Sequence, residues 1–125
     1  MSKVRGIRGA TTADANTKKA ILGATRELLE EMVKINEIEV DDVAATIFTT
    51  TEDLNAEFPA LAARQMGWNG VALMFGHEMK VPDALSGCIR VLLLVNTDKA
   101  ASELRSAYLR GAADLRSRGI EGVDL

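Results

Sequence analysis

The segment Cys88-Ile89-Arg90-Val91-Leu92-Leu93-Leu94-Val95 decides the fold, because it is the most apolar stretch of the chain and carries a charge near its start. The aliphatic run that ends it has no helical period, which predicts a central β-strand covered on both faces. The guanidinium of Arg90 stays protonated at any ordinary pH, so it needs an anionic partner. That partner is either a carboxylate of the protein, with solvent at the strand end, or a bound ligand. The segment alone leaves both interpretations open.

The composition predicts one globular domain that spans residues 1–125. Of the 125 residues 47% are hydrophobic and 26% are charged, as in an ordinary soluble protein. A net charge of -3 argues against a nucleic-acid-binding protein, which would carry a basic stripe. The single cysteine excludes an internal disulfide, and no spacing of Cys and His fits a metal site. No apolar run approaches the roughly 20 residues of a membrane span, and no signal core is seen, so we expect a cytoplasmic protein.

The first half of the chain alternates between strand and helix patterns. Residues 3–12 (KVRGIRGATT) predict a short strand whose glycines allow another element to approach closely. A helix with one apolar face is predicted from Asn16 or Thr17 to about Asn36. The β-branched residues at 43–51 (VAATIFTTT) predict a second strand.

The second half adds further elements around the Arg90 strand. A short helix is predicted at 58–66, and a strand at 71–75 leads into Gly76-His77-Glu78. After the Arg90 strand, Thr97 or Asp98 is expected to cap a last helix, in which four residues fall at helical spacing: Leu104, Ala107, Tyr108 and Gly111. The tail from about residue 116 has no period and is expected to be mobile.

Few polar residues suit nucleophilic or acid–base catalysis. His77 is the only histidine, and Glu78 beside it would face the other side of a strand, so a general-base role is disfavoured. Cys88 is interpreted as a buried structural thiol. No phosphate-binding loop, nucleophile elbow or zinc signature is present. If they converged, the remaining polar residues would suit a small polyanion: Arg5, Arg8, Arg64, Arg90, Arg116, Glu78 and Tyr108.

Several short motifs together resemble the monofunctional chorismate mutases of the AroH class. Their order and spacing over nearly the whole chain make the set specific, although each motif alone is weak. The motifs are Arg5-Gly6-Ile7-Arg8-Gly9-Ala10-Thr11-Thr12, Phe58-Pro59-Ala60 with Arg64 and Gly67-Trp68, His77-Glu78-Met79, Cys88-Ile89-Arg90-Val91, and Tyr108-Leu109 followed by Leu115-Arg116.

The resemblance implies an α+β fold, a mixed β-sheet with helices packed outside, three copies of which form a homotrimeric pseudo-α/β barrel of the chorismate mutase (bacillus-like) type. It implies the Claisen rearrangement of chorismate to prephenate in phenylalanine and tyrosine biosynthesis. That reaction is concerted and unimolecular, which explains the absence of a nucleophile, a metal or a cofactor from the pattern. The expected partners are the substrate, the product and further copies of the chain, with active sites between subunits and no nucleic acid or membrane.

The resemblance also implies roles for individual residues. Arg90 would contact the ether oxygen and a substrate carboxylate, and Glu78 would accept the ring hydroxyl. The other substrate-binding residues would comprise carboxylate ligands (Arg8, Tyr108), apolar walls (Phe58 of a neighbouring subunit, Leu115), charges at the mouth (Arg64, Arg116), and the strand end (Met74, Phe75, Gly76, His77).

This sequence departs from the family pattern at three positions. The family commonly has a threonine and a cysteine where Met74 and Phe75 stand, so only the backbone from Met74 to Glu78 is carried over. Leu61 replaces a lysine, which predicts weaker binding of the substrate. Two alternatives therefore stay open: a non-catalytic trimer that binds an aromatic-pathway metabolite, and an imine-deaminating protein with a similar trimeric barrel.

Overall fold

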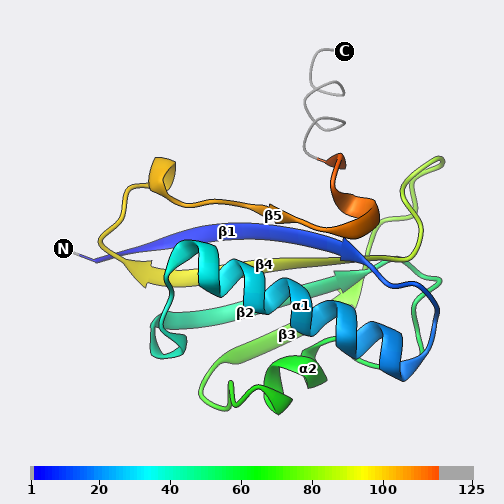
Figure 1. Cartoon of the computed structure of the whole chain (residues 1–125), viewed down its shortest axis with the longest axis horizontal. Helices are drawn as coiled ribbons and strands as arrows, with labels where there is room; N and C mark the ends of the chain where they lie inside the picture. The colour runs from blue at the N-terminus through cyan, green and yellow to red at the C-terminus, as the bar shows by residue number, and fades with distance from the viewer. Residues whose placement is uncertain (1, 116–125) are drawn as a thin grey trace.

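β4 (Cys88–Thr97) is the middle strand of a five-stranded mixed sheet with the order β3-β2-β4-β1-β5. The structure is a computed structural model that describes residues 2–115, so the tail predicted from about residue 116 lies outside the described residues. β4 pairs antiparallel with β1 (Lys3–Thr12) on one side and with β2 (Val43–Thr50) on the other. The prediction of a mixed α+β fold built around the Arg90 strand is confirmed (Figure 1).

The two outer strands run parallel to their neighbours. β3 (Ala72–His77) pairs with β2, and the two-residue β5 (Ala107–Tyr108) pairs with β1. The predicted bounds of the strands at 3–12, 43–51 and 71–75 agree with these to within two residues. Because β4 pairs along both edges, its register places the side chains of its two neighbouring strands, β1 and β2, relative to Arg90.

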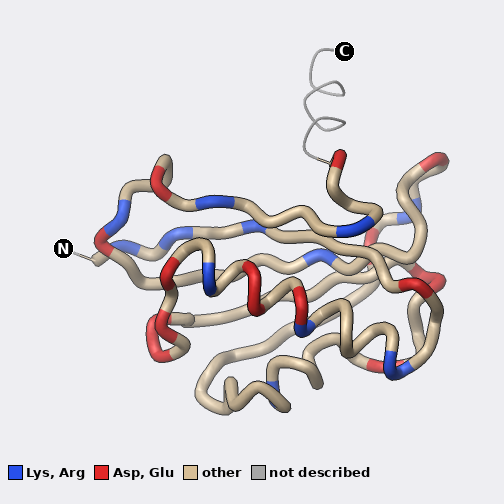
Figure 2. Tube along the Cα trace, in the orientation of Figure 1, with Lys and Arg blue, Asp and Glu red and all other residues tan. Residues whose placement is uncertain are grey.

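The long helix α1 (Lys18–Asn36) lies across one face of the sheet (Figure 1). The Thr17 hydroxyl caps its first turn by accepting the Ala20 N–H at 3.1 Å. Its apolar face is buried as the sequence pattern predicts, and its outer face carries both acidic and basic residues (Figure 2). Gly9 of β1 allows this close packing, since an added Cβ would lie 2.5 Å from the sulfur of Met32.

The short helix α2 (Ala60–Gln65) packs on the same side and completes the core. Its alanines join residues from α1 and the sheet in one cluster, which includes Leu28, Leu29, Met32, Phe48, Ala60, Ala63, Trp68, Val91, Leu93 and Val95. No helix within residues 2–115 is both long and apolar enough to cross a bilayer. The core therefore lies between the sheet and one layer of two α-helices.

The prediction of a last helix after the Arg90 strand is wrong. Where Leu104, Ala107, Tyr108 and Gly111 were expected on one helical face, the chain forms two 3₁₀ turns, η2 (Ala101–Glu103) and η3 (Arg110–Ala112), with β5 between them. The edge of β1 supplies the reason, because its unpaired backbone groups require a partner. Four apolar residues at suitable spacing are too weak a helical signal to outweigh that pairing.

The expectation that β4 is covered on both faces is also wrong for the single chain. Val91, Leu93 and Val95 point to the helices and are buried, whereas Leu92 and Leu94 on the opposite face are only partly covered. On that open face only one end is covered, where Cys88 packs with Ala10, Ala112, Leu85, Tyr108 and Leu115. Elsewhere on the open face, the partly covered Leu92 and Leu94 lie on the same side of β4 as the charged Arg90, and the described chain provides no covering layer there.

Candidate active site

Arg90 lies on the open face of β4 and forms an ion pair with Glu78 at the end of β3. Its Nε lies 2.8 Å from Glu78 Oε2 and 3.0 Å from Oε1. The Thr49 hydroxyl donates to Glu78 Oε2 at 2.8 Å, so the carboxylate is held from two directions. The Arg90 side chain is 44% exposed and that of Glu78 17% exposed. A protein carboxylate therefore partners Arg90, yet the guanidinium still reaches solvent.

The register of the sheet explains how these three side chains meet. Thr49 of β2 stands opposite Arg90 in the antiparallel ladder. Glu78 follows the last residue of β3, and its N–H donates to the Thr50 carbonyl at 2.8 Å, which extends the parallel pairing by one residue. The ion pair is thus built on two strand neighbours of β2 rather than on a loop.

A cavity of about 290 Å³ opens beside Arg90 on the same face. Arg8 of β1 and Tyr108 of β5 line it together with Arg90, and Ile47 and Leu92 form part of its apolar floor. Within residues 2–115, Arg8 has no ion-pair or hydrogen-bond partner, and the guanidinium of Arg90 forms no hydrogen bond or ion pair other than that with Glu78. Two cationic groups with unused donors thus face one partly apolar hollow.

His77 points away from this cavity. Its Nδ1 lies 3.2 Å from the Thr50 hydroxyl, and it lines a separate cavity of about 310 Å³ with Gly76. The expectation that His77 and Glu78 face opposite sides is confirmed, because each contacts a different residue of β2.

Phe58 and Phe75 also lie in the second cavity. Their ring centroids are 4.6 Å apart at an interplanar angle of 48°, a tilted aromatic pair. Both rings remain well exposed, at 58% for Phe58 and 45% for Phe75. Within one chain the structure therefore does not bring Phe58 to Arg90.

The remaining predicted site residues do not line the Arg90 cavity within the described chain. Met74 is 66% exposed and stands in register with Ile47. Arg64 is exposed on α2, and Leu115 packs at the covered end of the open face near Cys88. Arg116 lies outside the described residues.

Burial makes Cys88 a structural residue, as predicted. The side chain is fully buried, and burial raises the pKa of its thiol to about 11, so the reactive thiolate is disfavoured. Among residues 2–115, no group of three or more His, Cys, Asp or Glu side chains is placed to hold a metal ion.

A side-chain relay holds the start of β4 in place. The Asp53 carboxylate accepts the Gly87 N–H at 2.8 Å and the Thr51 hydroxyl proton, and Thr51 Oγ1 in turn accepts the Cys88 N–H at 3.0 Å. These contacts lower the pKa of Asp53, mainly through the hydrogen bond from Thr51. The relay ends two residues before Arg90, so it fixes the strand that carries the guanidinium.

Sequence reasoning did not single out Thr49. It stands among several threonines of one β-branched run, and only the register with Arg90 distinguishes it from its neighbours. Sequence reasoning also did not single out Arg110. A helix was predicted around it, whereas the structure places it at the start of a 3₁₀ turn.

The fold and the cavity define a small α+β protein with a fixed guanidinium–carboxylate pair beside a second arginine, an arrangement suited to a small anion with several oxygens. Residues 4–118 match the chorismate mutase type I family. The chain belongs to that family.

Individual relatives are similar to this chain over most of their own length. The chorismate mutase AroH of Thermus thermophilus is 51% identical over 114 residues, which cover 90% of this chain and 93% of the relative. The chorismate mutase AroH of Bacillus subtilis (strain 168) is 40% identical over 114 residues and 90% of each chain. A solved chorismate mutase from Clostridium thermocellum is 50% identical, with a TM-score of 0.85 over 86% of this chain and 96% of that chain.

Proposed function

We propose that this member of the chorismate mutase type I family converts chorismate to prephenate, with Arg90 and Glu78 at the reacting atoms. The observation that carries the assignment of residues is the Arg90–Glu78–Thr49 contact beside a cavity that Arg8 and Tyr108 also line. A unimolecular rearrangement of this kind requires a bound conformation and stabilised charge, both of which rigid polar groups can supply.

Arg90 is placed to stabilise negative charge. Glu78 engages its Nε, so the terminal nitrogens of the planar guanidinium are left to contact the ether oxygen and a carboxylate of the substrate. Negative charge grows on the ether oxygen as its bond to the ring breaks. A guanidinium held in advance by a carboxylate needs little reorganisation when that charge develops.

Glu78 complements the opposite end of the charge separation. Its carboxylate, held by Thr49 and Arg90, would accept the ring hydroxyl and lie near the positive charge that develops on the ring. Arg8 and the Tyr108 hydroxyl would bind the carboxylate of the enolpyruvyl arm from the β1 and β5 side of the cavity. The substrate would thus be held at both ends, with its arm folded over the ring.

We propose further that the working enzyme is a homotrimer with its sites between subunits. The open face of the sheet carries the half-buried Leu92 and Leu94 on the same side as Arg90, and packing three such faces would bury these apolar side chains inside a barrel with the helices outside. The Arg90 cavity of one chain is not lined by Phe58, Phe75, Met74 or Arg64, and in the trimer these residues would meet the cavity of a neighbouring copy. A biosynthetic enzyme of this class would act in the cytoplasm.

The experiment is the loss of chorismate ultraviolet absorbance on addition of the purified protein, without added metal or cofactor, with prephenate confirmed by its acid conversion to phenylpyruvate. Arg90→Ala should reduce the rate by roughly 10²- to 10³-fold or more while the protein stays folded. Arg90→Lys should also be poor, because one ammonium cannot reproduce the forked contacts.

Three results would overturn parts of the proposal. A folded trimer that binds prephenate but leaves chorismate unchanged would support the non-catalytic alternative, with Met74 and Phe75 as the first residues to replace. Full activity of Arg90→Ala would remove Arg90 from the reaction centre. A mass equal to one subunit at the assay concentration would contradict the shared-site arrangement.

A further inference from the structure

The turn that follows Tyr108 contains a residue to which the proposed site assigns no role. Arg110 begins η3, and its φ of 50° lies in the left-handed region that residues with a side chain seldom adopt. Such a conformation persists only where the surrounding contacts hold it. The contacts of Arg110 therefore indicate what keeps this turn in place.

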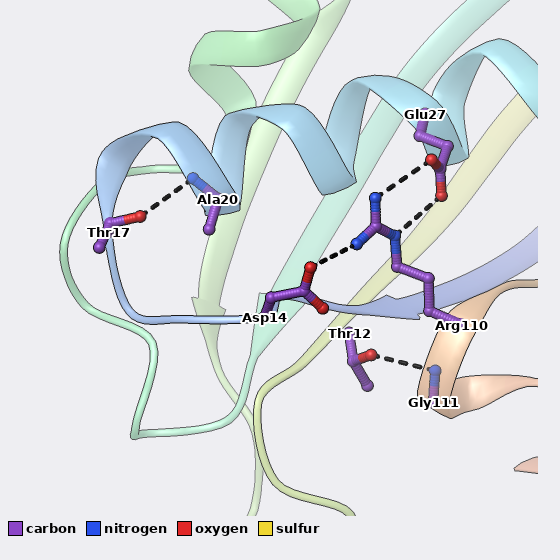
Figure 3. Close-up of polar contacts among 7 residues, drawn as sticks. All are labelled: Thr12, Asp14, Thr17, Ala20, Glu27, Arg110 and Gly111. Carbon is purple, nitrogen blue, oxygen red and sulfur yellow. Dashed lines mark hydrogen bonds and ion pairs between the residues drawn. The ribbon is translucent and has the colours of Figure 1, made fainter.

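The guanidinium of Arg110 joins two separate elements (Figure 3). Its Nε and one terminal nitrogen donate to the two carboxylate oxygens of Glu27 on α1, at 3.0 and 3.2 Å. Its other terminal nitrogen donates to Asp14, in the loop after β1, at 3.0 Å. We call Arg110, Glu27 and Asp14 the arginine clamp.

This arrangement is stronger than an ordinary surface ion pair. Exposed pairs contribute little as a rule, and the Arg110 side chain is 37% exposed, but bidentate geometry and shared networks are the exceptions. The hydrogen bond from Arg110 lowers the pKa of Glu27, and Glu27 raises the pKa of Arg110, so both groups are charged around neutral pH.

The contacts of the neighbouring Gly111 explain why the glycine stands at position 111 and not at position 110, where φ is positive. Glycine is the usual occupant of a positive φ, yet here Gly111 serves a close approach to β1. Its N–H donates to the Thr12 hydroxyl at 3.0 Å, and an added Cβ would lie 2.9 Å from that oxygen. Position 110 thus carries the ionic contact, and position 111 carries the contact that tolerates no side chain.

The backbone alone holds Tyr108 weakly. β5 pairs with β1 through only two residue pairs, Gly9 with Ala107 and Ala10 with Tyr108, and the Leu109 N–H donates to the Ala10 carbonyl at 2.9 Å. So short an edge strand has little cooperative pairing of its own. The clamp lies directly after it and ties the following turn to α1 and to the end of β1.

We propose that Arg110 is a positioning residue for substrate binding, because the arginine clamp holds the β5–η3 segment and with it Tyr108 against the cavity that contains Arg8 and Arg90. This inference rests on the proposed function, in which Tyr108 binds a substrate carboxylate. Arg110 itself does not line that cavity and touches no reacting atom.

The test compares Arg110→Gln with a matched control, Arg26→Gln. Arg26 pairs with Glu30 on the exposed face of the same helix, at 3.7 Å, and has no link to β5. Arg110→Gln should raise the KM for chorismate by roughly 3- to 10-fold with kcat changed less than about twofold, because binding contacts rather than transition-state contacts are weakened. Arg26→Gln should leave both constants unchanged.

Two further variants separate positioning from loss of stability. Arg110→Gly removes the clamp but relieves the left-handed backbone, and because the second effect offsets the first, KM should rise with little change in the unfolding temperature. In a Tyr108→Phe background, Arg110→Gln should add little to the rise in KM, since both changes weaken the same contact. Fully multiplicative effects of the two substitutions would overturn the assignment.

A measurement without substrate keeps this inference independent of the proposed function. Amide hydrogen exchange at Leu109 reports directly on its bond to Ala10, and Arg110→Gln should speed that exchange by about tenfold while Arg26→Gln does not. Unchanged exchange together with an unchanged KM would overturn the clamp. A wild-type protein that does not convert chorismate would instead overturn the proposed function, and the exchange result would still test the clamp.

Discussion

The two faces of the sheet use the same strands for opposite purposes. On the helix-covered face, Val91, Leu93 and Val95 of β4 are at most 2% exposed and pack against α1. On the open face, the intervening residues of the same strand are Arg90, Leu92 and Leu94, which are exposed or half-buried. Alternation along a strand therefore separates a stable core from a polar site by a single residue.

The difference teaches where a charge can be placed in an apolar strand. Arg90 is accommodated because no helix within residues 2–115 covers its side of the sheet and because Glu78 reaches it from the end of β3. The same guanidinium at position 91 or 89 would lie in the core, where an unpaired charge is strongly disfavoured. The site thus depends on a face that the folded subunit leaves open.

The largest expected effect comes from placing a charge on the apolar part of the open face. In Leu92→Asp, assembly would bury an unpaired carboxylate in each copy at a cost of several kcal/mol, so the trimer should dissociate. The subunit should stay folded, since Leu92 faces away from the helices. Light scattering and circular dichroism measure both properties, with Ser102→Asp at an exposed position as the control. A trimer of unchanged mass would show that this face is not the interface.

The next largest effect is expected from a substitution on the helix-covered face of β4. Leu93 is completely buried, and Leu93→Ala should lower the free energy of unfolding by about 2–5 kcal/mol through lost packing and a residual cavity. Urea unfolding in the monomeric Leu92→Asp background allows a fair comparison with Leu94→Ala, which should cost less because Leu94 is only half-buried there. Equal costs for both variants would mean that the two faces do not differ as the fold indicates.

A smaller effect is expected from the hydroxyl that orients Glu78. Thr49→Val removes the donor at 2.8 Å but keeps the shape of the side chain, and hydrogen bonds to charged groups are worth enough to change a rate by about tenfold. Thr49→Ser keeps the hydroxyl and should retain most of the activity. Steady-state kinetics on chorismate distinguishes the two, and equal rates for both variants would remove Thr49 from the site.

The smallest effect concerns acid stability. The pKa of Asp53 is lowered in the folded state, so its contribution is complete above the ordinary carboxyl value and is lost as the pH falls through the lower folded value. Asp53→Asn should therefore lower stability near neutral pH and flatten the decline in unfolding free energy as the pH falls below the ordinary carboxyl pKa. Urea unfolding at a series of pH values measures this decline. A decline as steep as in the wild type would show that Asp53 contributes nothing.

Much of the fold is encoded in short stretches of sequence. The helix that ends at about Asn36, its cap at Asn16 or Thr17, the strand at 3–12 and the strand that begins at Cys88 follow from periodicity and capping chemistry. The structure confirms these elements and identifies Thr17 as the cap. Local patterns failed at Ala107–Tyr108, where the pairing partner is almost a hundred residues away on β1. Such a contact leaves no mark on the periodicity of its own segment.

The sequence by itself determined most of the elements that form and the polar residues that are available, among them Arg8, Arg90, Glu78 and Tyr108. Only the tertiary structure decided which of them meet. The pairing of Glu78 and Thr49 with Arg90, the open face of β4 and the clamp between Arg110 and α1 all depend on strand register and on the covering of one face. The physical reason is that helix and strand patterns arise from neighbours along the chain, whereas register and packing arise from contacts between distant segments.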